Sequence, residues 1–206
     1  SLSSHIAEEC ANIGVPVVLF NRDIPDSHVS SVTSDNELGG RLVAELLVEK
    51  QHKRIAYIAG NENSSTNNDR ETGFQQGLAA AGLSVWKRKV GMYSFEGATA
   101  AARELLDTDE KPDAIFVAND HMAFAVMDVI RSEYGLRIPA DVSVVGYDNV
   151  PEADWAAYNL TTVEQPVDDM IAETVNVLLE QMEHKQVSAV HKVTDARLIV
   201  RSSVRS

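Results

Sequence analysis

Three runs of apolar residues in this chain each end abruptly in an amide beside a charged side chain. The polar residues that follow these runs are Asn21-Arg22-Asp23, Asn119-Asp120 and Asp148-Asn149. Amides and carboxylates donate or accept hydrogen bonds, so the chemistry they offer is the binding of a polar ligand. If the runs are neighbouring parallel strands, their polar ends share one edge of a sheet, where open α/β sheets form a ligand crevice.

The same residues have structural roles that compete with ligand binding. Asp148 lies at the mouth of the predicted crevice, where we expect ligand contact rather than the alternative, a helix N-cap. Asp120 starts the next helix, so we expect it to cap that helix. For Asn119, ligand binding and a simple turn at the end of a strand stay equally open from the spacing alone.

An arginine and two aromatic residues add to this set. Arg70 opens a predicted helix, where the helix dipole disfavours a cation unless an acceptor faces it. This position indicates a functional arginine, and the alternative is a solvated side chain paired with Asp69 or Glu71. Tyr93 offers an aromatic face to a sugar or a base, whereas we expect Phe95 to pack in the core.

Motifs for catalysis, phosphate binding and metal binding are missing from the sequence. Neither a G-x-S-x-G nucleophile elbow nor a G-x-x-x-x-G-K-[ST] phosphate loop occurs, and Cys10 lies beside two glutamates that disfavour its thiolate. The histidines form no H-x-x-x-H or H-E-x-x-H pair. The sequence therefore predicts no enzyme, no cofactor and no metal site.

An acidic composition limits the partners that the chain can bind. Its 206 residues include 31 acidic and 18 basic side chains, which give a formal net charge of −13. This charge offers no surface-wide attraction to DNA phosphates. The 44% hydrophobic content suffices for a core, yet no apolar stretch could span a bilayer and no signal peptide is visible. We expect a soluble, cytoplasmic protein with no membrane contact.

Helical and strand patterns alternate along the chain, which predicts an α/β fold with parallel sheets. Ser34 and Glu37 have the spacing of a capping box ahead of a helix that ends near residue 50. The first strand needs neighbours that the preceding residues cannot supply, so we expect the sequence to be part of a longer protein. The expected strands are 17–20, 54–59, 86–90, 114–118, 142–147 and 192–200, with a short crossing segment over 160–163. The other expected helices are 4–13, one carrying Phe74 and Leu78 up to Gly82, 96–106, one ending at Gly135, and 167–182 with Met170, Ile171, Val175, Leu178 and Leu179 as its apolar face.

Several segments carry a resemblance through their order and spacing. They are 15–22, 39–42, 52–60, Arg70-Glu71-Thr72-Gly73-Phe74, 118–123, 138–148, 161–166 and 198–203. Together they resemble the effector-binding domain of the LacI/GalR family of bacterial transcription regulators, whose fold is similar to that of periplasmic sugar-binding proteins. The segment 138–148 is the most specific of them.

The resemblance implies a two-lobed protein that binds an effector between its lobes and regulates DNA binding as a homodimer. It assigns residues 1–34 and 166–188 to a partial first lobe, and 35–165 and 189–206 to the second. Operator DNA would be bound by a helix-turn-helix domain that is absent from these residues. The positions that match family ligand contacts are Asn21, Arg22, Thr66, Arg70, Tyr93, Asn119, Asp148 and Gln165.

Two departures from the family pattern bear on the ligand. A loop position that holds arginine in purine-responsive members resembles Ser64 here, and the aromatic position is Tyr93 rather than Trp or Phe. Both differences favour a neutral sugar or polyol over a purine. A periplasmic sugar-binding transport receptor shares the fold and is the alternative function, but the segments 138–148 and 198–203 favour the regulator.

Overall fold

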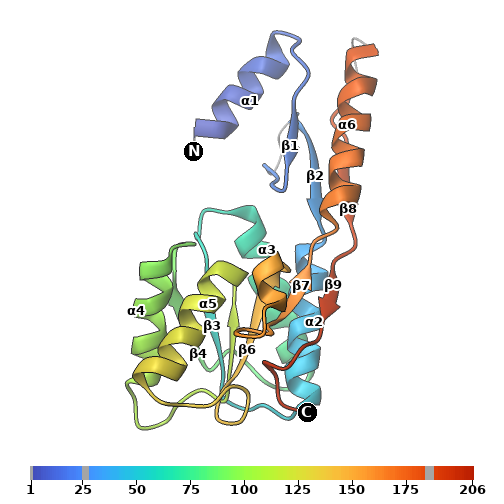
Figure 1. Ribbon diagram of the computed structural model, residues 1–206. Coiled ribbons are helices and arrows are strands. Elements are labelled where there is room, and N and C mark those ends of the chain that lie inside the picture. The colour runs from blue at the N-terminus through green and yellow to red at the C-terminus, as the bar shows by residue number, and fades with distance from the viewer. Residues whose placement is uncertain (1, 25–27, 184–187) are drawn as a thin grey trace. The chain divides into compact units, whose positions relative to one another are not determined.

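The computed structural model describes residues 2–24, 28–183 and 188–206, and the chain divides into two compact units (Figure 1). Unit 1 comprises Ser1–Asp35 and Gln165–Ala196, and unit 2 comprises Asn36–Glu164 and Arg197–Ser206. The chain therefore passes from unit 1 to unit 2, returns, and enters unit 2 again with its last residues. Each unit has its own sheet.

Unit 2 is built on a six-stranded sheet with the order β4-β3-β5-β6-β7-β9. All neighbouring strands are parallel except β9, which runs antiparallel to β7. Every residue of the central strands β3 and β5 is buried, as their continuous apolar runs predicted. The strands are β3 (Ile55–Ala59), β4 (Lys87–Val90), β5 (Ala114–Val117), β6 (Ser143–Asp148), β7 (Thr161–Glu164) and β9 (Arg197–Ile199).

Helices cover both faces of this sheet, with α4 and α5 side by side on one face and α2 and α3 on the other (Figure 1). Beneath α3, the rings of Tyr57, Phe74 and Phe116 form a cluster with centroids 4.8–5.8 Å apart. The C-cap of α3 is Ala81, one residue before the predicted Gly82, which follows with φ +71° and donates its backbone amide to the Ala79 carbonyl. The helices are α2 (Asn36–Glu49), α3 (Ser65–Ala80), α4 (Phe95–Leu106) and α5 (Asp120–Asp128), with a π-helical turn over Val129–Glu133 and a 3₁₀ turn over Pro151–Asp154.

Unit 1 has a parallel three-stranded sheet with the order β1-β2-β8. Its strands are β1 (Val18–Phe20), β2 (Ser30–Ser34) and β8 (His191–Thr194), and its helices are α1 (Leu2–Asn12) and α6 (Val167–Glu183). Strand β2 was missed by the sequence analysis because three of its five residues are serines. The Ser30 hydroxyl nevertheless accepts hydrogen bonds from the Val190 amide and the Gln181 side chain, which makes serine compatible with this buried strand.

Three expectations about these elements were wrong. Ser34 is the last residue of β2 and α2 begins at Asn36, so the expected capping box does not form. The single strand expected over 192–200 is two strands, because β8 pairs with β2 in unit 1 and β9 pairs with β7 in unit 2. Residues 189–196 thus belong with unit 1 rather than with the second lobe. On α6 only Met170 and Val177 are buried, whereas the expected apolar face at Ile171, Val175 and Leu179 is about half exposed.

Candidate functional site

Strands β3, β5 and β6 are parallel neighbours in unit 2, so their carboxyl ends lie at one edge of the sheet. The residues at these ends are Gly60 after β3, Asn119 shortly after β5, and Asp148 as the last residue of β6. Helix α3 starts just after the β3 end and carries Thr66 and Arg70 in its first two turns. Four of the eight predicted site residues therefore belong to the elements of this edge, and a fifth, Tyr93, follows the neighbouring strand β4.

Arg70 is the buried cation of the edge, with only 3% of its surface exposed. Its Nε donates to Asn36 Oδ1 at 2.9 Å and its Nη1 donates to the Ala118 carbonyl at 2.6 Å. The guanidinium carbon lies 3.7 Å from the centroid of the Tyr147 ring, in a cation–π contact. Burial alone would lower the pKa of Arg70, but the Asp148 carboxylate and the nearby tyrosines raise it. The solvated alternative is thus excluded, and Arg70 is fixed and charged.

Asp148 faces this arginine, with its Oδ1 3.5 Å from Arg70 Nη2. Its side chain is 25% exposed, so its carboxylate is still accessible to a ligand. The backbone at Asp148 has φ +115° and that at Asn149 has φ +54°, values that non-glycine residues rarely adopt. Such strained residues concentrate at binding sites. The helix-cap alternative is excluded, because the following 3₁₀ turn has Val150 as its N-cap.

The cap of α5 is Asn119 rather than Asp120, which was expected to cap this helix. Asn119 is the N-cap of α5 and its Oδ1 accepts a hydrogen bond from the Met122 amide at 3.1 Å. Asp120 is fully buried and binds elsewhere: Oδ1 accepts from the Thr162 hydroxyl at 2.6 Å and Oδ2 accepts from the Val150 amide at 2.9 Å. Burial raises the pKa of Asp120 to about 7. Capping by Asn119 leaves its amide NH₂ group as the part that could serve a ligand.

Tyr93 lies against the backbone of the loop that follows β3. A Cβ atom placed on Gly60 would be 2.1 Å from Cζ of the Tyr93 ring, so only glycine lets the ring approach this closely. The Tyr93 hydroxyl is buried and has no hydrogen-bond partner within the described residues, which is uncommon for a buried polar group. Phe95 was expected in the core, but it is the first residue of α4 and is 57% exposed.

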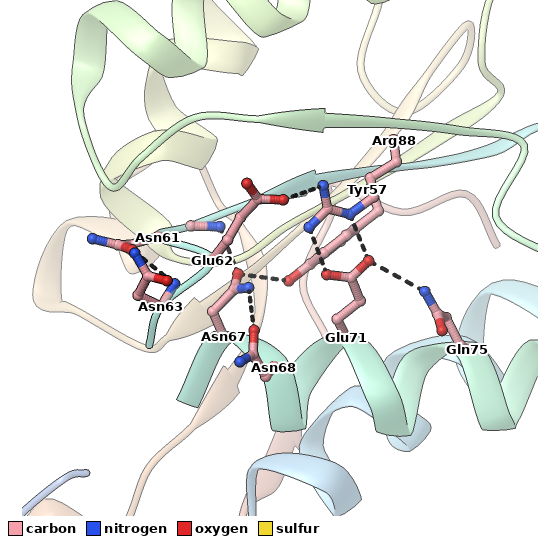
Figure 2. A network of polar contacts seen from close by, with 10 residues as sticks. Tyr57, Asn61, Glu62, Asn63, Asn67, Asn68, Glu71, Gln75 and Arg88 are labelled. Atoms are coloured by element: carbon pink, nitrogen blue, oxygen red, sulfur yellow. Dashed lines mark hydrogen bonds and ion pairs between the residues drawn. The ribbon is translucent and has the colours of Figure 1, made fainter. Parts of the chain in front are cut away.

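A polar network holds the loop between β3 and α3 in place, and Figure 2 shows its side chains converging on Asn67 and Arg88. Asn67 is fully buried, and its Oδ1 accepts from the Gly60 amide at 2.6 Å and from the Tyr57 hydroxyl at 3.3 Å. Arg88 on β4 donates to Glu71 through two nitrogens, at 2.6 and 2.9 Å, and to Glu62 at 2.9 Å. The loop is thus anchored to both the sheet and α3.

Thr66 lies within this anchored segment and is buried, with 8% of its surface exposed. Its Oγ1 is 2.8 Å from the Oγ of Ser64, the loop position at which arginine was expected in purine-responsive relatives. The two hydroxyls therefore form a neutral hydrogen-bonding pair at the start of α3. They add hydroxyl donors and acceptors to the charged pair of Arg70 and Asp148.

The remaining three predicted site residues belong to unit 1. Asn21 follows β1 with φ +52°, and its backbone N–H donates to the Val32 carbonyl at 2.9 Å. Arg22 is exposed, and Gln165 is buried at the start of the segment leading into α6. Their convergence with the residues of unit 2 in one pocket stays a prediction.

Several residues that hold this edge together could not be predicted from the sequence. The Tyr147 ring and the Asn36 side-chain oxygen both hold Arg70. The Asn67 side-chain oxygen holds the loop after β3. A cation–π partner gives no spacing signal, and a single Asn at a helix start resembles any cap. The charged and aromatic composition of the edge suits a polar ligand with several hydroxyl groups. No group of His, Cys, Asp or Glu that could hold a metal ion occurs within the described residues.

Comparisons with known proteins point in one direction. A family described as periplasmic binding protein-like domain matches residues 44–204. The HTH-type transcriptional regulator CelR of Thermobifida fusca is 37% identical over 194 residues, which cover 92% of this chain and 57% of that protein. The HTH-type transcriptional repressor CytR of Escherichia coli strain K12 is 32% identical over 193 residues, covering 93% and 56%.

A solved structure described as a transcriptional regulator CelR–cellobiose complex superposes with a TM-score of 0.86 at 36% identity, over 94% of this chain and 60% of that one. The chain thus spans a little over half the length of these relatives. Within the described residues, no helix is both long and apolar enough to cross a membrane.

Proposed function

The chain belongs to the periplasmic-binding-protein-like domain family, within the LacI/GalR group of transcription regulators, and from this premise we propose that it is their ligand-sensing domain. It binds a small neutral sugar or polyol and controls the DNA affinity of a homodimeric cytoplasmic regulator. Operator DNA is bound by a helix-turn-helix domain outside these 206 residues. The relatives are regulators, so we do not retain the transport receptor as a second candidate.

One observation carries the proposal: a buried arginine and a partly exposed aspartate face each other across 3.5 Å at the carboxyl edge of β6. Together they supply donors and acceptors for vicinal hydroxyl groups, and charged groups make stronger hydrogen bonds than neutral ones. Ser64 and Thr66 add hydroxyls, and Tyr93 supplies an aromatic face. Asn21, Arg22, Asn119 and Gln165 complete the proposed site.

The absence of a cation at position 64 favours a neutral ligand. A purine base presents ring nitrogens and carbonyls that an arginine would serve, whereas Ser64 offers only a hydroxyl. A pocket whose polar groups bind sugar hydroxyls discriminates strongly against analogues that lack one of them, because its buried groups are then unpaired. We therefore expect the deoxy analogue of the effector to bind far more weakly than the effector itself.

The test is a ligand screen on the full-length protein. Thermal shift with monosaccharides, cellobiose, polyols, nucleosides and purine bases identifies the ligand, and calorimetry gives its affinity. We expect a sugar or polyol to raise the unfolding temperature, and Asp148→Asn to weaken its binding about ten-fold or more, the cost of one charge-assisted hydrogen bond.

Asp148→Asn tests ligand binding more directly than Arg70→Ala does. Truncating Arg70 would leave the buried Asn36 and Ala118 acceptors without their donor and so lower stability, whereas the Asp148 side chain is a quarter exposed. Asp128→Asn, at an exposed position on α5, is the matched control. Equal affinity in Asp148→Asn and the unmodified protein would refute the site, and binding of purine bases alone would refute the ligand class.

A further inference from the structure

Asp120 is a fully buried carboxylate that the proposed site does not use. It starts α5, yet Asn119 satisfies the cap of this helix, so Asp120 is free to bind elsewhere. Its two oxygens accept hydrogen bonds from two other elements: the Thr162 hydroxyl on β7 and the Val150 amide after β6. The carboxylate thus ties together three segments that meet at the carboxyl edge of unit 2.

The Val150 bond fixes the turn that begins at Asp148. Asp148 and Asn149 both have positive φ. The backbone N–H of Asn149 donates to Thr162 Oγ1 at 3.4 Å, and the same hydroxyl donates to Asp120. Two consecutive non-glycine residues in this conformation persist only where neighbouring contacts hold them. Asp120 and Thr162 supply such contacts on the inner side of the turn.

Space for this carboxylate is provided by a glycine on the strand that carries Asp148. A Cβ atom on Gly146 would lie 2.2 Å from Asp120 Oδ1 and 2.9 Å from the Leu160 side chain. Residue 146 therefore has to be glycine for the Asp120 carboxylate to reach Thr162. The position of the Asp120 carboxylate thus depends on α5, which carries it, and on β6, whose Gly146 leaves room for it.

We propose that Asp120 is a positioning residue of the effector site, which holds the Asp148–Val150 turn so that the Asp148 carboxylate faces Arg70. It touches no ligand itself and acts through the Val150 amide and the Thr162 hydroxyl. The proposal rests on the proposed function, because it assigns Asp120 to the binding of the same ligand through Asp148.

Three variants separate geometry from charge. Asp120→Ala removes both acceptors. Asp120→Asn keeps the shape, since its amide oxygen can accept from Val150 and its NH₂ can donate to Thr162 Oγ1 once that hydroxyl rotates. Asp113→Ala is the matched control: Asp113 precedes β5 at the opposite edge, and its carboxylate also accepts from two backbone amides, those of Lys53 and Arg54.

Calorimetry on the full-length protein uses cellobiose and the sugar that gives the largest thermal shift, at a temperature where every variant is folded. We expect Asp120→Ala to lose about ten-fold or more in affinity, while Asp120→Asn regains most of it. Asp113→Ala should lose stability but keep the affinity. Unchanged affinity in Asp120→Ala, or an equal loss in Asp113→Ala, would overturn the proposal.

A second readout needs no ligand. In the ligand-free protein, the ¹³C carboxyl titration of Asp148 reports how close Arg70 is held, since a nearby cation lowers a carboxyl pKa. We expect the Asp148 midpoint to be higher in Asp120→Ala than in Asp120→Asn, because both variants lack the Asp120 charge and only Asp120→Asn keeps the hydrogen bonds of the turn, and to stay in place in Asp113→Ala. If no sugar binds the unmodified protein, the proposed function fails, whereas this titration still decides whether Asp120 positions Asp148. Equal Asp148 midpoints in Asp120→Ala and Asp120→Asn would contradict the positioning role.

Discussion

Asp120 and His52 are buried ionisable side chains whose pKa values move in opposite directions. Burial raises the pKa of Asp120 to about 7, and the nearby Asp148 charge adds to this, while the Thr162 and Val150 hydrogen bonds oppose it. Burial, helped by Arg205, lowers the pKa of His52 although Asp113 faces it. At each residue, burial favours the neutral form over the charged one.

These shifts predict a specific effect of Asp120→Asn on the pH dependence of stability. The folded carboxyl keeps its proton up to about pH 7, whereas the unfolded one loses it near the ordinary value of 3.8. The folded state thus binds more protons in this window, so the contribution of Asp120 to stability declines as the pH rises through it. We expect the unfolding free energy of the unmodified protein, relative to Asp120→Asn, to decrease across this range in urea titrations.

The comparison with Asp120→Asn removes the contribution of His52. Because the pKa of His52 is lowered in the folded state, His52 makes the protein more stable as the pH rises towards 6.5. In the unmodified protein this gain partly masks the loss of stability that Asp120 causes. His52 is present in both proteins, so its contribution cancels in the difference. A difference that does not change with pH would mean that Asp120 is ionised throughout the range.

Among the secondary-structure elements, the site depends on the close packing of α2 against α3. Gly40 and Gly73 lie where the two backbones meet: a Cβ on Gly40 would be 2.1 Å from the Arg70 carbonyl oxygen, and one on Gly73 would be 1.9 Å from that of Glu37. Because α3 carries Arg70 and α2 carries its partner Asn36, this contact sets the distance between them.

Gly73→Ala is therefore expected to destabilise unit 2 and to weaken ligand binding. The added methyl group forces the helices apart, and overpacking of this kind costs roughly 1–3 kcal/mol. Thermal unfolding and calorimetry with the sugar identified in the screen measure the two effects. Thr72→Ala, an exposed position on the same helix, is the control and should change neither. Full stability in Gly73→Ala would show that the helices can separate without cost.

The two units differ in how much core each one has. Unit 2 has a six-stranded sheet whose central strands are completely buried, with a three-ring aromatic cluster beneath α3. Among its described residues, unit 1 has three short strands, a small cluster of Ala7, Leu19 and Val29, and a helix α6 with only two buried residues. Less buried apolar surface means a smaller free energy of opening.

We therefore expect the units to open separately in hydrogen exchange. In the 206-residue chain, amides of β2 and β8 should exchange faster than those of β3, β5 and β6, measured by mass spectrometry under native conditions. The amides of helices α2 and α3 serve as internal controls because both helices belong to unit 2. Equal protection of all these strands would show that the chain opens as one cooperative unit.

The fold class and most elements of unit 2 could be predicted because their signals are local. Continuous apolar runs mark β3, β5 and β6, and the structure places these strands within about a residue of the predicted bounds. Polar residues after such runs must emerge at the carboxyl edge, so the position of Asn119 and Asp148 at this edge could be predicted from the sequence alone. The family followed from the order of the motifs, because order and spacing are properties of the sequence itself.

Other features depend on contacts between distant residues and have no local signal. The serine-rich β2 is a strand because it pairs with β1 and β8, while Gln181 and Val190 satisfy the Ser30 hydroxyl. The split of β8 from β9 depends on which sheet each strand joins. That Asp120 does not cap α5 depends on Thr162, 42 residues further along the chain, whose hydroxyl donates to the Asp120 carboxylate. The sequence determined which side chains reach the edge, whereas tertiary packing decided which of them are buried, charged and held by one another.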